Sequence, residues 1–319
     1  MSTLRLGIII PVGLGLFCAA LVVASCAGNN RDTKKQEEIK RFVLPTIPSM
    51  LLVPQERADY LVTHYWNHFD FSDTSLIHLP AYTEQAFRDY IDVLPHAPYA
   101  SILASVEQTL SKATGNRNMF THFIELFEKY LYNPNSPLRN EELYALAVEY
   151  VINSDQIDDT DKIRLRYQWE QIQKNRQGSV AADFSYSLIS GAQERMHRIQ
   201  ADYLLLFLYD PDCHSCGEIL QGIHASPVVG EAINRGILKV LAVYVAKDIE
   251  RWEQYQVVVP KTWISAYDPL QTIEQEKLYD LRALPTMYLL DKQKRVLIKD
   301  AIQHQVDQLL VQELQKPPF

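Results

Sequence analysis

The stretch from Tyr203 to Cys216 reads YLLLFLYDPDCHSC and decides the fold of the second half of the chain. Its unbroken apolar run, Leu204 to Tyr209, is too short for a ten-residue helix and has the length of a strand buried on both faces. Pro211 then suits the first turn of a helix, because the N–H that proline lacks would have had no intrahelical partner there. An amphipathic segment, Gly217 to Ile233, follows. We therefore predict a buried strand, a turn and a helix, with both cysteines of the stretch at the helix start.

The Cys-x-x-Cys pair, Cys213 and Cys216, gains chemical properties from that position. Unpaired N–H groups at a helix start carry roughly half a positive charge. This charge favours the thiolate, which is the attacking species in disulfide exchange. Cys213 is therefore the predicted nucleophile. Three residues make almost one helical turn, so Cys216 lies on the same face and is the predicted resolving cysteine, which attacks the mixed disulfide that Cys213 forms.

Strand, proline-containing turn, Cys-x-x-Cys and helix resemble the redox site of the thioredoxin superfamily, and the flanking sequence resembles its membrane-associated TlpA-like branch. The resemblance covers Gly178 to the C-terminus, including a small-residue entry with an Asp-Phe pair that implies a strand or hairpin, and a turn at Ser190 and Gly191. Leu238 to Val245 is predicted to be a second buried strand, and Ile249 to Tyr255 a short helix. A strand, a helix and another buried strand form the parallel crossover unit of α/β folds.

A second part of the resemblance lies around Leu284-Pro285-Thr286. Thioredoxin-like domains place a cis-proline opposite the Cys-x-x-Cys pair, and Pro285 matches it. The resemblance implies that the neighbouring backbone pairs with an extended client chain, so Leu284 and Thr286, together with His214, are candidate binding residues. The alternative is an ordinary trans proline at the start of a strand. A hairpin and a C-terminal helix follow: Thr286 to Leu290, Val296 to Lys299, and Gln303 to Leu314.

The site departs from the family pattern in three places. Asp212 stands where the family usually has Trp, and Phe207 stands where thioredoxin keeps a buried Asp that accepts the proton of the second cysteine. Many TlpA-like proteins carry Glu three residues after the second cysteine. That position is Ile219 here, and Glu218 precedes it. Glu218 is a candidate catalytic base, and its alternative role is that of a solvated surface residue.

The N-terminal 25 residues have the pattern of an export signal. Arg5 precedes an apolar run from Leu6 to Val23, and small residues stand directly before Cys26. This end resembles the lipobox of bacterial lipoproteins, whose cysteine is acylated, so Cys26 is the predicted lipidation site. The run is also just long enough for a transmembrane anchor. Residues 26–40 are polar and charged, as in a solvated tether. Ala27 is not acidic, so the resemblance leaves inner and outer membrane undecided.

Residues 41–176 are predicted to form an all-α domain, and residues 177–319 the thioredoxin-like α/β domain. Apolar residues recur at helical spacing in six blocks separated by Pro or Gly: Gln55 to Phe69, Thr83 to Leu94, Tyr99 to Ala113, Asn118 to Leu131, Asn140 to Ile152 and Thr160 to Lys174. Phe120, Phe123 and Phe127 form one stripe, which favours a core role over a partner groove. His64 and His68 lie four residues apart, but no zinc-protease pattern accompanies them, so no metal site is predicted.

If Cys18 leaves with the signal and Cys26 carries lipid, only Cys213 and Cys216 remain in the mature protein. No cofactor is then expected beyond this redox-active pair, in a periplasm-facing compartment where disulfides persist. The net charge of −8 argues against a nucleic-acid partner. The expected partners are protein thiols and disulfides, a redox partner, and the lipid bilayer through Cys26.

The sequence thus predicts a membrane-anchored periplasmic thiol-disulfide oxidoreductase in the bacterial cell envelope. The alternative is a non-catalytic thioredoxin-fold lipoprotein that acts as a protein-binding module. A peroxidase is disfavoured because Asp210 occupies the Thr position of the peroxiredoxin pattern. Metal binding by the two thiols and His224 is under-ligated for a structural zinc site. The direction of electron flow and the clients are left open.

Overall fold

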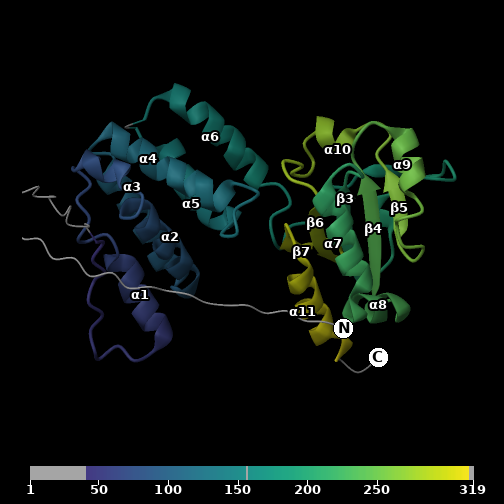
Figure 1. The fold of residues 1–319 in the computed structure, drawn as a ribbon, viewed down its shortest axis with the longest axis horizontal. Helices are drawn as coiled ribbons and strands as arrows, with labels where there is room; N and C mark the ends of the chain where they lie inside the picture. Colours follow the sequence, from purple (N-terminus) through teal and green to yellow (C-terminus); the bar gives the residue numbers. More distant parts are fainter. Residues whose placement is uncertain (1–40, 156, 316–319) are drawn as a thin grey trace, which may run out of the picture. The chain divides into compact units, whose positions relative to one another are not determined.

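The computed structural model describes residues 41–155 and 157–315 (Figure 1), and the chain from Arg41 onward clusters into one compact unit. The predicted signal segment, the tether and Cys26 lie outside the described residues. A helical region comes first, and a mixed α/β sheet region follows it, as the sequence predicted. Among the described residues, none of the helices has the length and apolar character that a membrane span requires.

Within the described residues, the helical region contains six α-helices, and their bounds follow the apolar spacing closely: α1 Pro54–His64, α2 Thr83–Val93, α3 Tyr99–Ala113, α4 Arg117–Phe127, α5 Glu141–Asn153 and α6 Asp159–Ile172. The first helix is shorter than predicted, because the chain turns after His64. A π-helical turn, Glu128–Tyr132, continues α4. Phe123 and Phe127 are fully buried and Phe120 packs against the same core, so this stripe is a core face.

Seven strands form one sheet in the order β2-β1-β5-β4-β3-β6-β7. Their bounds are β1 Ser185–Leu188, β2 Gln193–Arg195, β3 Tyr203–Tyr209, β4 Leu238–Tyr244, β5 Ile264–Tyr267, β6 Thr286–Asp291 and β7 Val296–Lys299. Strands β3, β4 and β5 are parallel neighbours, and β6 and β7 form the antiparallel hairpin beyond β3. The hairpin β1–β2 turns at Gly191, whose φ of 81° lies in the left-handed region that glycine tolerates best.

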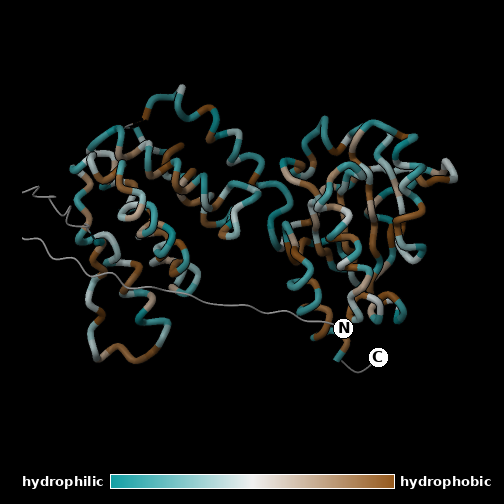
Figure 2. The backbone as a smooth tube through the Cα atoms, viewed as in Figure 1, coloured by the Kyte–Doolittle hydropathy of each residue, from teal (hydrophilic) through white to brown (hydrophobic). Residues whose placement is uncertain are grey.

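The central strand β3 is buried on both faces, as its apolar run predicted. Leu205 and Phe207 point into the same core as Cys216, whereas Leu204 and Leu206 point into the core on the opposite face. The first core is covered by α7 His214–Ala225, α8 Pro227–Asn234 and α11 Gln303–Leu314, which contact one another (Figure 1). Figure 2 shows hydrophobic residues along the central strands and polar ones on many of the connecting loops.

Two local features differ from the sequence prediction. The amphipathic segment after the cysteines is two helices, because Ser226 caps α8 by accepting from the Val229 N–H at 3.3 Å, and Pro227 begins that helix. The Ser226 hydroxyl also donates to Asp307 Oδ1 on α11 at 2.8 Å. Strand β5 was not predicted. Short helices α9 Ile249–Tyr255 and α10 Thr272–Gln275 flank it in sequence.

Candidate active site

The chain reverses direction between β3 and α7, and this turn carries the cysteines. The Cys213 N–H donates to the Asp210 carbonyl at 3.1 Å, and the Asp212 N–H donates to Asp210 Oδ1 at 3.0 Å. Cys213 is the N-cap residue of α7, with φ −83° and ψ 112°. The first cysteine therefore lies directly at the helix N-terminus, where the helix dipole stabilises negative charge.

The Cys213 sulfur meets the loop that precedes β6. Its Sγ donates to the Leu284 carbonyl at 3.2 Å, although the two residues are 71 positions apart in sequence. The Ser215 hydroxyl lies 3.1 Å from the same sulfur and donates to the same carbonyl at 3.1 Å. The Leu284–Pro285 peptide bond is cis, the isomer that the resemblance implies. The structure thus brings Cys213, Leu284 and Pro285 together, and adds Ser215, which sequence reasoning did not single out.

Cys216 occupies the opposite environment. Its side chain lies in the first turn of α7 and is fully buried in the core, whereas Cys213 is half-buried, and both thiols are free. Burial is the largest cause that raises the pKa of the Cys216 thiol, and a hydrogen bond with Cys213 raises it further. The second cysteine is therefore held as a thiol in contact with the first, the arrangement that a resolving cysteine needs.

Two further residues adjoin the pair. Burial raises the pKa of Tyr255, and the nearby Cys216 adds to this shift. The Tyr255 hydroxyl also lies beside Gly217, since a Cβ added there would meet it at 3.6 Å. Asp210 is the carboxylate whose charge acts on Cys216. Nothing in the sequence pattern pointed to Tyr255, because α9 is remote from the Cys-x-x-Cys motif.

The other candidate residues have different neighbours. His214 and Glu218 are both exposed and lie one turn apart, with Nε2 3.4 Å from Oε1, so Glu218 faces His214 on the solvent side of α7. The Thr286 hydroxyl donates to the Asp280 carbonyl at 2.7 Å and to the Ala283 carbonyl at 2.8 Å. Thr286 therefore shapes the loop before β6.

Asp212, which stands in the position usual for Trp, pairs with Arg251. Its Oδ1 accepts from Arg251 Nε at 3.0 Å and lies 2.9 Å from Arg251 Nη2 on α9. This ion pair neutralises the carboxylate next to Cys213. Because the pair is largely exposed, its contribution to stability is small, roughly 0–1 kcal/mol.

The described residues contain no group of three His, Cys, Asp or Glu side chains arranged to hold a metal ion. His64, one of the paired histidines, stacks on Tyr60, and its Nδ1 lies 2.8 Å from the Tyr60 carbonyl. These contacts account for His64 as part of a helix surface.

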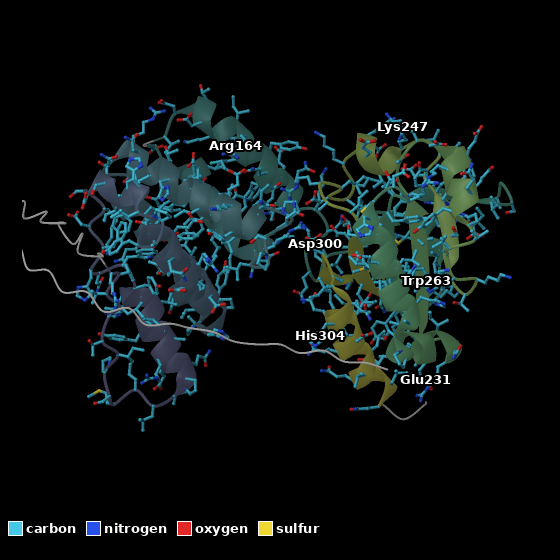
Figure 3. All side chains as sticks on the ribbon, in the orientation of Figure 1. Arg164, Glu231, Lys247, Trp263, Asp300 and His304 are labelled. Atoms are coloured by element: carbon cyan, nitrogen blue, oxygen red, sulfur yellow. The ribbon has the colours of Figure 1, made fainter. Side chains whose placement is uncertain are left out.

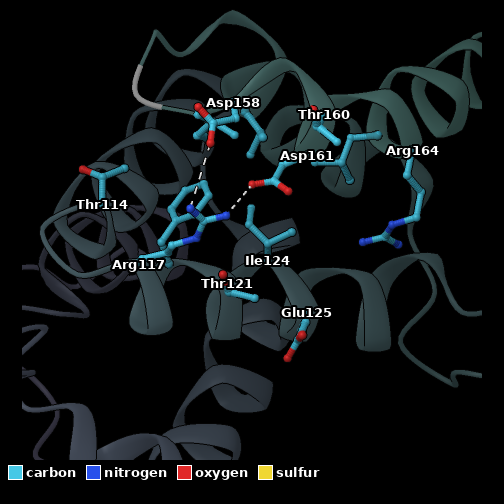
Figure 4. Close-up of a pocket in the computed structure, with 13 residues that line it drawn as sticks. Thr114, Arg117, Thr121, Ile124, Glu125, Asp158, Thr160, Asp161 and Arg164 are labelled. Carbon is cyan, nitrogen blue, oxygen red and sulfur yellow. Dashed lines mark hydrogen bonds and ion pairs between the residues drawn. The ribbon is translucent and has the colours of Figure 1, made fainter.

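A separate cavity of about 530 Å³ lies in the helical region between α4 and α6 (Figure 4). Its two arginines already have partners within the chain. Arg117 lies 3.0 Å from Asp161 and 4.0 Å from Asp158, and Arg164 pairs with Glu128. None of the redox residues lines this cavity.

A largely buried ion cluster, with Arg282 at its exposed edge, joins the helical region to the loop that carries Pro285. Arg139 pairs with Glu141 at 2.8 Å, Asp280 at 3.1 Å and Asp300 at 2.7 Å. Lys299 pairs with Glu141 at 2.9 Å. Asp300 lies in the turn between β7 and α11, where Figure 3 labels it.

Arg282 belongs to the same cluster. It pairs with Asp280 at 2.6 Å and with Glu141 at 3.2 Å, and its guanidinium lies 3.7 Å from the ring centroid of Tyr132. Burial alone would raise the pKa of Glu141, but Lys299 and Arg139 together hold it below its usual value. The cluster therefore fixes the loop before β6 against the start of α5.

The helical region matches the domain of unknown function DUF5106 over residues 24–175. The comparison with curated proteins finds no match. A crystal structure of a thioredoxin-like protein from Bacteroides caccae is 40% identical, with a TM-score of 0.83, over 87% of this chain and 99% of that chain.

Two structures from Bacteroides fragilis match less than half of this chain. The C-terminal domain of an uncharacterized protein is 42% identical over 43% of this chain and 98% of that chain, with a TM-score of 0.42. A conserved protein of unknown function is 39% identical over 42% of this chain and 98% of that chain, with a TM-score of 0.41. The match that spans both regions decides the relationship: the chain belongs to the family of the thioredoxin-like protein of Bacteroides caccae.

Proposed function

We propose that this protein is a thiol-disulfide oxidoreductase that exchanges disulfides through Cys213-His214-Ser215-Cys216. One observation carries the proposal: the half-buried Cys213 sulfur lies 3.2 Å from the carbonyl of Leu284, directly before cis-Pro285, with Cys216 buried beneath it. A client chain that lies across Pro285 presents its sulfur to Cys213, and the second thiol is protected from solvent until it is needed.

The exchange proceeds in two steps. The Cys213 thiolate attacks one sulfur of a client disulfide, the client S–S bond breaks, and the other client sulfur leaves as a thiolate that takes up a proton. Cys216 then loses its proton and attacks Cys213 Sγ. The mixed disulfide breaks, the second client thiol is released, and the Cys213–Cys216 disulfide forms. The client gains two electrons, the protein loses two, and the reverse sequence oxidises a client dithiol.

Electrons come from or go to a redox partner with a thiol or disulfide, and no cofactor beyond the cysteine pair takes part. We propose that Cys26 is acylated and anchors the chain to a bacterial membrane, with the folded part facing the periplasm. Support for this placement comes from the small residues before Cys26 and the polar segment after it. The match to the domain of unknown function begins at residue 24, next to this cysteine.

The function is tested with a trapping variant. Cys216→Ser keeps the nucleophile and removes the resolving thiol, so we expect it to accumulate mixed disulfides with disulfide-bonded insulin, seen by non-reducing mass spectrometry. Wild type is expected to reduce insulin when a dithiol is supplied, and Cys213→Ser to do neither.

The opposite result would favour the alternative function. If wild type reduces no disulfide and Cys216→Ser traps no client, the thioredoxin fold serves as a binding module. A variant with both cysteines changed to serine would then retain the biological role.

A further inference from the structure

A groove of about 1060 Å³ begins at the redox site and runs to the helical region. At one end it is lined by Pro285 and by Ile219 of α7. At the other end it is lined by the turn that precedes α5, from Pro134 to Glu142. Pro285 directly follows Leu284, whose carbonyl contacts the Cys213 sulfur, so the groove adjoins the loop that meets the reactive thiol.

One wall of the groove is a face of α11. Gln305, Gln308, Leu309 and Gln312 line it, and their spacing of three and four residues places them on a single helical stripe. Ile302 lies at the N-cap of this helix and is 59% exposed. This wall therefore offers apolar contacts and side-chain amides, which can both donate and accept hydrogen bonds, and carries no charge.

The charged residues of the groove already have partners within the chain. Arg139, Glu141 and Asp300 belong to the buried ion cluster, in which each carboxylate faces a cation. Lys299 is held by Glu141 at 2.9 Å. Glu142, the remaining charged residue of the lining, pairs with Arg176. Each charged group that lines the groove therefore has a partner of opposite charge within the chain, and none is left unpaired to attract a charged ligand.

We propose that this groove binds an extended, uncharged and partly apolar segment of the client protein, on one side of the cysteine that reacts with Cys213. The turn from Pro134 to Glu142 supplies the far wall, which gives the helical region a role in client selection. The inference rests on the proposed function, and deepens it by naming the client's chemistry. The volume of about 1060 Å³ is slightly above the roughly 300–1,000 Å³ typical of small-molecule pockets, which fits a chain of several residues.

The test measures how fast Cys213 captures two activated disulfides. The full chain carries Cys18→Ser, Cys26→Ser and Cys216→Ser, so Cys213 is its one remaining thiol. The first probe is a peptide of about twelve alternating Val and Ser residues, about 40 Å long when extended, with a central cysteine bonded to thionitrobenzoate. The second probe is glutathione bonded to the same group. In each case Cys213 bonds to the probe sulfur, and the released thionitrobenzoate anion is followed by its absorbance.

We expect the peptide to react at least about tenfold faster than glutathione, a difference of about 1.4 kcal/mol. Ile302→Asp places a charge in the groove, and is expected to lower the ratio of peptide to glutathione rates about tenfold. Asp is a favoured N-cap residue, so α11 should tolerate the change. Pro137→Asp changes the helical wall, where Pro137 is exposed, and is expected to lower the same ratio.

Two matched controls lie outside the groove. Ile189→Asp alters an isoleucine that is 60% exposed in the β1–β2 turn, at the opposite end of the sheet, and Pro80→Asp alters an exposed proline of the helical region. Both should keep the wild-type ratio. Equal rates for the two probes, or equal effects of groove and control variants, would contradict the proposal that the groove binds the client segment.

This readout is separate from the proposed function, because thionitrobenzoate release needs only a reactive Cys213 thiol. If the protein reduces insulin but shows no peptide preference, the proposed function stands and the proposed role of the groove is wrong. If the protein shows the peptide preference but reduces no disulfide, the groove binds peptide and the proposed oxidoreductase function is wrong. If Pro137→Asp alone has no effect while Ile302→Asp does, the helical region is excluded from client selection, which contradicts the inference as stated.

Discussion

At the residue scale, the two cysteines differ in every property that disulfide exchange depends on. Cys213 caps α7, is half-buried and touches a backbone carbonyl beside Pro285, whereas Cys216 is fully buried among the aromatic residues of the sheet. Phe207 occupies the place of thioredoxin's buried carboxylate and is itself fully buried. Proton transfer from Cys216 therefore cannot use a carboxylate at that position.

This asymmetry predicts selective alkylation. In the native protein at pH 7 we expect iodoacetamide to modify Cys213 about a hundredfold faster than Cys216 or more, because burial hides Cys216 and raises its thiol pKa, so little thiolate is present. The measurement is a time course of the two cysteine-containing peptides by mass spectrometry. The same reaction in concentrated urea is the control, where the two rates should converge. Equal native rates, or a faster Cys216, would contradict the assignment of roles.

The sequence was sufficient for the roles proposed for Cys213, Cys216 and Pro285, because each has a local signal: a motif at a helix start, or a proline before a buried strand. It was insufficient for Ser215 and Tyr255. Ser215 lies between the cysteines, but it is linked to the loop before β6 by the hydrogen bond that its hydroxyl donates to the Leu284 carbonyl. Tyr255 lies near the pair although its helix is remote in sequence. Contacts of this kind depend on tertiary packing, which a single sequence does not display.

At the element scale, strong periodicity was enough to predict most helices and strands. Strand β3 is a continuous apolar run, β4 is apolar apart from Lys239, and β6 has the apolar run Met287 to Leu290. Helices α3 and α11 coincide with their predicted ranges. Strand β5 was missed because Ile264–Tyr267 is short and has only one fully buried residue, so it lacks an apolar run. The break between α7 and α8 was missed because Ser226-Pro227 lies inside an otherwise regular apolar pattern.

The turn between β7 and α11 yields a prediction about pH. Burial raises the pKa of Asp300 to about 6 against its usual 3.8, although Arg139 opposes the shift. The folded state therefore binds this proton more tightly than the unfolded state. The stabilising contribution of the protonated form is present below pH 3.8 and is lost as the pH rises to about 6.

We expect Asp300→Asn to gain stability relative to wild type as the pH rises through this window, by up to about 3 kcal/mol. The measurement is urea unfolding of both proteins at several pH values across the window. The free energy of unfolding of the variant is compared with that of wild type at each pH. This comparison is needed because the pKa values of Glu141 and Asp280 are lowered in the folded state, so their contributions to stability change with pH in the opposite direction. A difference that stays constant with pH, or that falls, would contradict a raised pKa at Asp300.

At the scale of the whole molecule, the helical region and the sheet region are linked through charges that lie far apart in the sequence. Arg139 precedes α5, and Glu141 is its first residue. Asp280 lies before the β6–β7 hairpin, Lys299 ends it, and Asp300 follows it. Sequence reasoning gave no sign of this cluster, because isolated charges in loops are ordinarily solvated. The cluster holds the loop that bears Pro285, so the helical region helps to fix this part of the candidate active site.

The ion cluster predicts a large loss of stability when its central cation is removed. Arg139→Met leaves Glu141, Asp280 and Asp300 without one of their partners, and removing one member of a buried ion pair costs about 3–5 kcal/mol. Arg117→Met is the matched control. Arg117 also pairs with two carboxylates, but it is 75% exposed, so its loss should cost about 1 kcal/mol or less. Urea unfolding measures both, and equal effects would contradict a buried, structural cluster.

The reduction potential of the Cys213–Cys216 pair is the most direct test of a redox-active site. Equilibration with glutathione or dithiothreitol buffers, followed by quantification of the free thiols, should give a single two-electron transition. We predict a potential between roughly −270 and −120 mV, the range spanned by thioredoxin and the strong oxidant DsbA. A potential below roughly −300 mV, as in structural disulfides, or the absence of a disulfide between Cys213 and Cys216 under oxidising conditions, would contradict disulfide exchange as the function of this site.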